Sequence, residues 1–315
     1  MNEQELINQM IQEGNAYSYV EYMRKENFKS SIAARAAFEH DIFRPSVIYK
    51  YASKDIRDSI INELNKDDLG ELMNVNNLLL ALAQIGDDAV CKAFMRWEEQ
   101  PPRWREKLYV GPAHYAMEGG WCIEDGRKKI LTYNSCYSLH RTYYPDEADI
   151  VIGGLSEQKC PYCKSSYSNL LVMDGKDERL SDFGIKGKIK IKHCASCLPY
   201  EPFMFCKYEV DGEGEVIHRT EGEDFHMDDR DMNDLKYFKL SKEPVSDIYC
   251  NEFERSAIGG SPAFIDDAVY ADCPICKRKM KHFVQLSDED SGAGGTVYVQ
   301  ICTDCEIAAV LYQQT

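Results

Sequence analysis

Eight of the 13 cysteines in the chain fall into four C-x-x-C pairs, a spacing that lets two thiolates reach one metal ion from the same side. The pairs run in the order C-P-x-C then C-x-x-C, and this order occurs twice, as CPYC with CASC and as CPIC with CTDC. The candidate metal ligands are Cys160, Cys163, Cys194, Cys197, Cys273, Cys276, Cys302 and Cys305. Two pairs complete one tetrahedral site, so we expect two structural Zn²⁺ ions with no open coordination position for catalysis.

Inert buried cysteines, an iron–sulfur cluster and a redox dithiol are the alternatives to zinc. Pairing of the ligands within each copy is the simplest assignment, and a crossed arrangement between copies is the other. His193 and His282 lie near the predicted ligands, and for His193 we expect core packing or a hydrogen bond rather than ligation. The cysteines without a pairing pattern are interpreted as small buried hydrophobic residues: Cys91, Cys122, Cys136, Cys206 and Cys250.

The residues around the cysteine pairs also repeat, which indicates an internal duplication. An IGG triplet at residues 152–154 precedes the first copy, and another at residues 258–260 precedes the second. GKIKIKHC (residues 187–194) matches GTVYVQIC (residues 295–302), with glycine seven positions before the cysteine in both. The chain therefore contains the same metal-binding device twice.

Strand-like runs lie between the two pairs of each copy, as in a zinc ribbon. The predicted arms are LLVM and KIKIK in the first copy and FVQL and TVYVQI in the second. SDEDSGAGG joins the second pair of arms and has the composition of a turn. These arms are the elements that bring the cysteine pairs together.

The chain up to about residue 118 has helical spacing of its apolar residues. Ser53 is a predicted N-cap, Gly86 a left-handed helix end, and Asp87 or Asp88 the next N-cap. Residues 81–99, ALAQIGDDAVCKAFMRWEE, resemble one unit of a HEAT-type repeat, a helix pair that offers a surface to protein partners. An ordinary helical domain is the alternative.

A change of pattern divides the chain into two parts. Asp125–Gly126 lies between two short runs and predicts a hairpin, and the polar segment TYYPDEAD at residues 142–149 predicts a boundary. We therefore expect an α+β protein with a helical, HEAT-like domain at residues 1–145 and a β-rich domain at residues 146–315. The duplicated zinc-ribbon-like units should span about residues 150–210 and 255–315, with a solvated acidic loop at residues 211–234.

The formal net charge is −16, which argues against an electrostatic nucleic-acid binder and favours a basic protein partner. The exception is KGKIKIKH at residues 186–193, whose alternating lysines predict one basic strand face or, more simply, a solvated edge strand. The chain has no apolar run of 18 residues and a polar start, so we expect no membrane association and a cytoplasmic location, where cysteines more often bind metal than form disulfides.

Catalytic motifs are not found in the sequence. Zinc deaminases need a H-x-E upstream of a P-C-x-x-C, and no H-x-E occurs here. A phosphate-binding G-x-x-x-x-G-K-S/T, a H-E-x-x-H and a G-x-S-x-G are also missing, and SGAGGT (residues 291–296) is interpreted as a turn between strands. We therefore expect a protein that is not an enzyme.

The final 60 or so residues resemble the YwqG-like family of bacterial proteins, which carries a G-G-x-P-x-W-I segment, a C-x-x-C, a strand with Q-L, a glycine-rich turn, an aromatic strand and a second C-x-x-C. Phe264 stands where the family's aromatic residue is expected. The other matching residues are Gly259, Gly260, Pro262, Ile265, Gln285, Leu286 and Tyr298. The resemblance implies no activity, and members are associated with accessory or immunity roles near toxins.

Three functional hypotheses follow. The first is a non-enzymatic, zinc-stabilised protein-binding protein, such as a bacterial immunity protein that engages a basic toxin through an acidic surface. The second is a zinc-ribbon nucleic-acid or ribosome-associated factor that uses the alternating lysines. The third is an enzyme with an unrecognised site.

Overall fold

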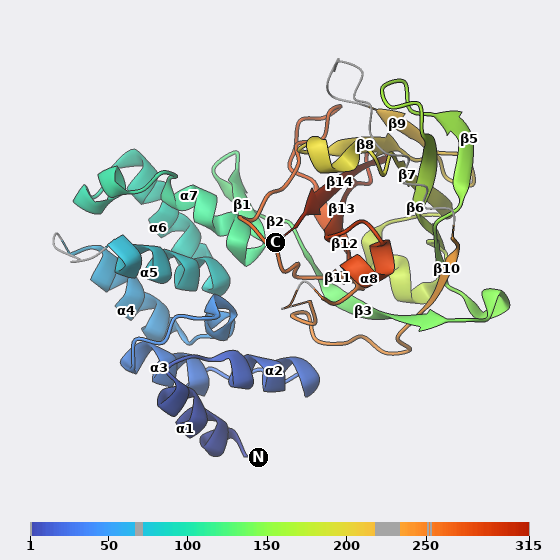
Figure 1. Cartoon of the computed structure of the whole chain (residues 1–315). Helices are drawn as coiled ribbons and strands as arrows, with labels where there is room; N and C mark the ends of the chain where they lie inside the picture. Colours follow the sequence, from blue (N-terminus) through green and yellow to red (C-terminus); the bar gives the residue numbers. More distant parts are fainter. Residues whose placement is uncertain (1, 67–71, 218–233, 251, 253, 315) are drawn as a thin grey trace. The chain divides into compact units, whose positions relative to one another are not determined.

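The computed structural model of the chain describes residues 2–66, 72–217, 234–250, 252 and 254–314, and it divides into two compact units (Figure 1). Unit 1 is Met1–Leu131 and unit 2 is Thr132–Thr315. The division lies before strand β3 (Tyr133–Thr142) rather than near residue 145, because β3 pairs with strands of unit 2. The acidic loop expected at residues 211–234 falls largely outside the described residues.

Unit 1 is helical and ends in a small hairpin. Its α-helices are α1 (Glu3–Glu13), α2 (Tyr17–Lys25), α3 (Ile32–Glu39), α4 (Lys54–Leu64), α5 (Leu72–Ile85), α6 (Asp88–Glu99) and α7 (Pro112–Tyr115). Short 3-10 helices are η1 (Ser46–Tyr49), η2 (Arg103–Lys107) and η3 (Ala116–Gly119), and the hairpin strands are β1 (Trp121–Glu124) and β2 (Arg127–Ile130). No helix among these described segments is long and apolar enough to cross a bilayer.

The turn between α5 and α6 has the predicted capping. Gly86 follows α5 with a φ of +53°, and the Asp87 side chain accepts hydrogen bonds from the backbone N–H groups of Ala89 and Val90. Ser53 precedes α4 as predicted, but its hydroxyl makes no capping bond. The pairing of α5 and α6 is thus explained by local sequence, whereas a HEAT-type array stays a prediction.

Unit 2 is built from strands β3 to β14, which form one sheet with antiparallel pairing throughout the described residues. The bounds after β3 are β4 (Ile150–Ile152), β5 (Leu155–Lys159), β6 (Ser166–Asp174), β7 (Lys188–His193), β8 (Met204–Lys207), β9 (Glu215–Ile217), β10 (Lys236–Leu240), β11 (Ala257–Gly260), β12 (Lys281–Leu286), β13 (Thr296–Cys302) and β14 (Ile307–Gln313). The short helices are η4 (Pro145–Glu147), η5 (Glu178–Phe183), η6 (Leu198–Tyr200) and α8 (Asp288–Ser291). Helices of unit 1 followed by this sheet confirm the α+β class.

The sheet curls until its ends approach each other. The strand order is β5-β6-β4-β10-β3-β11-β12-β13-β14-β8-β9, with β7 on the other edge of β6. The backbone N–H of Lys192 in β7 lies 3.3 Å from Cys206 Sγ in β8, and Asp211 N donates to Lys188 O at 2.7 Å. Inside the curl, one apolar core joins residues of both copies, such as Ile150, Ile189, Val297 and Val310.

The two copies exchange their leading strands. Strand β3 precedes the first copy in the chain but pairs with β11 of the second, and β10 precedes the second copy but pairs with β4 of the first. The leading strands then pair with each other, β3 with β10, and the closing strands β8 and β14 also pair. The strands of each copy are therefore extended by a strand that precedes the other copy in the chain.

In each copy, the IGG triplet lies where the backbone in or next to the exchanged strand comes close to the copy's own backbone. Gly153 has a φ of +95° and Gly259 a φ of +74°, a region that side-chain-bearing residues rarely adopt. A Cβ at Gly153 would lie 2.1 Å from the carbonyl oxygen of Asp234, and one at Gly259 would lie 2.1 Å from that of Ser135. Asp234 precedes β10 and Ser135 lies in β3, so equivalent glycines allow equivalent close approaches.

Candidate metal centres

The eight predicted ligands form two groups of four, each within one copy of the repeat. The four sulfur atoms of each group lie within 4.8 Å of one another. We call Cys160, Cys163, Cys194 and Cys197 the first quartet, and Cys273, Cys276, Cys302 and Cys305 the second quartet. This grouping favours pairing within each copy over the crossed arrangement.

Sulfur–sulfur distances in both quartets suit a shared metal ion. Cys160 Sγ and Cys197 Sγ are 3.7 Å apart, and Cys276 Sγ and Cys302 Sγ are also 3.7 Å apart. Metal–sulfur bonds of about 2.3 Å in a regular tetrahedron place the sulfurs about 3.8 Å from each other. A disulfide would need about 2.05 Å, and none of the 13 cysteines is in a disulfide.

The C-P-x-C turns of the two copies have the same backbone. The amide N–H of Lys164 donates to Cys160 O at 3.1 Å, and that of Lys277 donates to Cys273 O at 2.9 Å. Both lysines have a positive φ, +66° and +62°. Sequence reasoning missed these lysines, although a C-P-x-C-K pattern occurs in both copies and would have indicated them.

Equivalent side chains connect the two turns of each quartet, but with different chemistry. In the first quartet the hydroxyls of Ser165 and Ser196 lie 3.3 Å apart, and both residues are buried. In the second quartet Arg278 and Asp304 occupy the equivalent positions and form an exposed ion pair. The two turns of the first quartet are thus connected by neutral hydroxyls, and those of the second quartet by a charged pair.

The second thiol of the C-P-x-C turn is shifted in the same direction in both quartets. Against the raising effect of burial, hydrogen bonds from Ser165 lower the pKa of Cys163 in the first quartet to about 7. In the second quartet, the backbone N–H of Arg278 donates to Cys276 Sγ, and with its guanidinium it lowers the pKa of Cys276 to about 6. A bound divalent cation would hold all four sulfurs as thiolates in either case.

Neither buried histidine is part of a quartet. Burial lowers the pKa of His193 to about 4, and its Nδ1 lies 3.3 Å from Ser168 O, in line with the expected packing role. Burial lowers the pKa of His282 to about 3, and neither of its ring nitrogens has a hydrogen-bond partner among the described residues. The five cysteines without a pairing pattern are all buried, as predicted.

Three buried glutamines hold the segment before the second quartet; Gln285 is part of the family-like motif, whereas sequence reasoning missed Gln300 and Gln313. Gln285, Gln300 and Gln313 lie on the neighbouring strands β12, β13 and β14. Each accepts from a backbone N–H and donates to a backbone carbonyl of residues 252–271; for example, Gln300 accepts from Ala271 N at 2.7 Å and donates to Val269 O at 2.7 Å. The segment therefore lies across the outer face of these strands.

The alternating lysines of β7 do not form a free basic face. Lys188 is exposed, but Lys190 and Lys192 both pair with the Glu213 carboxylate, at 2.7 Å for Lys192. Hydrogen bonds from these two lysines lower the pKa of Glu213 to about 2. The Lys192 side chain is only 2% exposed, so the expectation of a solvated edge strand is wrong at this position.

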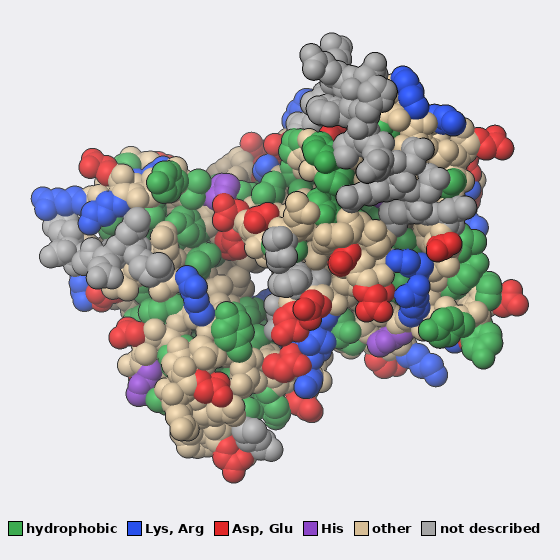
Figure 2. All heavy atoms as spheres, viewed as in Figure 1, with side chains coloured by type: hydrophobic (Ala, Val, Ile, Leu, Met, Phe, Trp, Pro, Cys, Tyr) green, Lys and Arg blue, Asp and Glu red, His purple; other side chains and the backbone are tan. Residues whose placement is uncertain are grey.

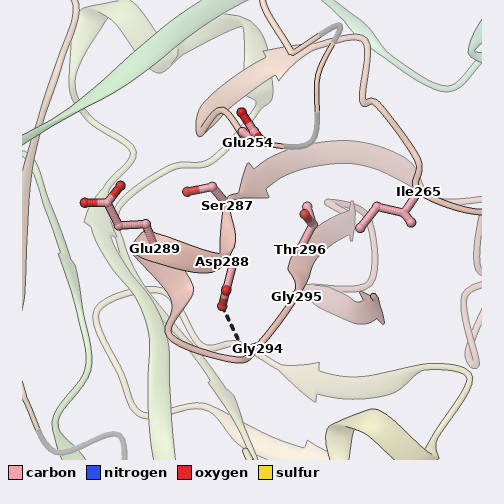
Figure 3. Close-up of a pocket in the computed structure, with 8 residues that line it drawn as sticks. All are labelled: Glu254, Ile265, Ser287, Asp288, Glu289, Gly294, Gly295 and Thr296. Atoms are coloured by element: carbon pink, nitrogen blue, oxygen red, sulfur yellow. Dashed lines mark hydrogen bonds between the residues drawn. The ribbon is translucent and has the colours of Figure 1, made fainter. Parts of the chain in front are cut away.

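Acidic side chains (red in Figure 2) are scattered over both units on the face shown, with lysines and arginines (blue) between them. An open pocket of about 470 Å³ lies beside α8 in unit 2, and Figure 3 shows its lining. Three carboxylates line it, from Glu254, Asp288 and Glu289, and Asp288 Oδ1 accepts from Gly294 N at 2.8 Å. The described lining contains no cysteine or histidine.

Comparison with curated proteins finds a relative in Salmonella typhimurium (strain LT2), named "Uncharacterized protein YpfL", which is 29% identical over 284 aligned residues. The alignment covers 84% of this chain but 64% of the relative, so the chain spans less than two thirds of that protein's length. No family model matches the chain, and the resemblance to YwqG-like proteins stays a prediction. No solved structure matches it.

Proposed function

We propose that the protein is a zinc-stabilised binding protein whose ligand is another protein and which carries out no reaction itself. The observation that carries this proposal is the pair of four-sulfur groups, each compact enough to enclose one ion. A tetrahedral ion with four protein ligands has no position left for water or substrate, so its role is to hold the chain.

The places of the quartets support this role. The first quartet lies where β7 ends, and the second lies where β13 ends. Cys160, Cys194 and Cys197 are part of the main core of unit 2, and Cys273 is part of a smaller core that includes Tyr298 and Leu311. Ions at these points would fix the ends of β7 and β13 together with the turns that carry the cysteines.

Metal analysis of the natively purified chain tests the first half of the proposal. We expect two zinc ions per chain by native mass spectrometry and elemental analysis, because thiolate quartets select zinc over harder cations. The paired variant C273S/C302S should retain one ion. A wild-type chain without tightly bound metal, or with an iron–sulfur absorption spectrum, would exclude zinc as the structural ion.

The second half concerns the partner, which we propose to be a basic protein such as a bacterial toxin encoded nearby, in the cytoplasm. A net charge of −16 and the carboxylate-lined pocket beside α8 support a basic partner. Purified protein should retain a basic product of a neighbouring gene on a column, and the association rate should fall as salt is raised. Salt-independent binding, or failure of every neighbouring product to bind, would count against the acidic-surface mechanism.

A further inference from the structure

The outer faces of the two copies are used differently. In the second copy, Tyr298 and Gln300 point outward from β13 and hold the chain's own backbone; the Tyr298 hydroxyl donates to Ala263 O at 2.6 Å. Aligning GKIKIKHC with GTVYVQIC places Lys190 and Lys192 of β7 at these two positions. Only the five-residue strand β5 lies between the IGG triplet and the cysteines of the first copy, so within the described residues this stretch contains no segment equivalent to the one that covers the second copy.

A pocket of about 380 Å³ occupies this place in the first copy. Its volume lies within the range of small-molecule sites. The described lining residues come from β5, β6, β7 and the turn before β9: Leu155, Ser156, Glu157, Gln158, Asn169, Lys190, Lys192 and Glu213. The same outer face therefore carries a bound segment in one copy and a cavity in the other.

Lys192 is the unusual group in this pocket. A lysine ammonium is rarely buried unless its charge is paired, and it has three N–H donors to satisfy. Among the described residues its ammonium has one partner, Glu213, whose own side chain is 61% exposed. Asn169 lies beside it in the sheet, paired with Lys192 across β6 and β7, and its buried Oδ1 has no described partner.

We propose that this pocket binds a small ligand with one oxyanion group, a carboxylate or a phosphate, and that Lys192 and Lys190 are its principal contacts. Glu213 occupies the lysines in the free protein as an internal competitor. Glu157 also lines the pocket, so the lining carries both signs of charge and favours a compact monoanion over a polyanion such as nucleic acid. The site lies apart from the partner surface proposed above and does not depend on it.

Isothermal titration calorimetry of the zinc-loaded full chain tests the proposal with two probes, N-acetylglycine and inorganic phosphate, and with neutral N-acetylglycinamide as the control probe. The tighter of the two anions identifies the group that the site prefers. E213Q should bind that anion about tenfold more tightly than wild type, because the internal carboxylate no longer competes. K192Q, which introduces the residue of the second copy, should bind at least about tenfold more weakly.

K188Q is the matched control, because Lys188 lies on the same strand but is exposed and does not line the pocket. It should bind as wild type does. The E213Q gain provides a readout that does not depend on how well K192Q folds. Three outcomes would overturn the proposal. Wild type and E213Q could both fail to bind either anion at about 10 mM, E213Q could also bind the neutral probe more tightly, or K188Q and K192Q could lose affinity equally.

Discussion

The first quartet has three buried cysteines and a buried pair of serine hydroxyls between its turns, whereas the second has one buried cysteine and an exposed arginine–aspartate pair. Their C-P-x-C turns nevertheless have matching hydrogen bonds and matching positive-φ lysines. The backbone that presents the sulfurs has thus been kept in both copies while its surroundings diverged. We infer that the first quartet serves the main core of unit 2 and that the second serves a local part of it.

Removing metal ligands should separate the two quartets most clearly. C160S/C194S should leave unit 2 without a cooperative unfolding transition, because a structural zinc site contributes about 10 kcal/mol or more in small domains and a whole domain is stable by about 5–15 kcal/mol. C273S/C302S should lower the unfolding temperature by about 10 °C and leave a folded unit. Circular dichroism melts of the matched pair measure this, and equal losses would contradict the comparison.

The equivalent glycines should respond alike in both copies. G153A and G259A should each cost more than about 3 kcal/mol, because the new Cβ would meet a carbonyl oxygen at 2.1 Å and adopt a strained φ. G184A is the control: Gly184 has a φ of +73°, but its nearest neighbouring atom would be 3.7 Å away, so about 1 kcal/mol is expected. Urea unfolding measures the loss of unfolding free energy in each variant. A large loss in only one of G153A and G259A would contradict the equivalence of the two copies.

The buried histidines should make the protein less stable in acid. The folded-state pKa of His282 is lowered to about 3, so the unfolded chain takes up its proton first as pH falls below about 6.5, and stability is lost from there towards pH 3. This contribution is at most about 1.4 kcal/mol per pH unit. H282L should remove it, and the difference between the wild-type and variant curves separates it from metal release, which both share.

At neutral pH the two histidines should differ. H282L removes ring nitrogens that have no described partner, so little stability should be lost, whereas H193L removes the contact with Ser168 O and should cost about 1 kcal/mol. Chemical denaturation at pH 7.5 compares them. A larger loss for H282L would mean that its ring has a polar role.

The smallest effect is expected at the connection between the turns of the second quartet. R278A should change the unfolding temperature by less than about 2 °C, because exposed ion pairs contribute little and are screened by salt. S165A should cost about 1 kcal/mol, because it removes a buried hydroxyl partner of Ser196. A reversal of this order would contradict the different environments of the two quartets.

Local pattern predicted much of this protein. The C-x-x-C spacing identified both quartets, the alternation in GTVYVQIC indicated β13, and Gly86 with Asp87 marked the turn between α5 and α6. These features depend on neighbours in the chain, so a single sequence contains the information.

Features that depend on distant neighbours were not predicted. No pattern in the sequence indicates the partners of β3, and its pairing with β10 and β11 follows from closure of the whole sheet. The sequence predicts a solvated Lys192, because Glu213 and β5 come near this lysine only in the folded chain. The contacts of the buried glutamines likewise depend on residues 252–271, which lie across them in the fold.

The exchange of leading strands has a consequence for the order in which the ribosome delivers the chain. Strand β3 is synthesised before either of its neighbours, and the later of these, β11, ends at Gly260. Until β10 has emerged, both edges of β3 are open templates for pairing with another nascent chain, and one edge stays open until Gly260 has emerged. Truncated products that end between β3 and β11 should therefore aggregate through β3, even when their first quartet is complete and loaded with metal.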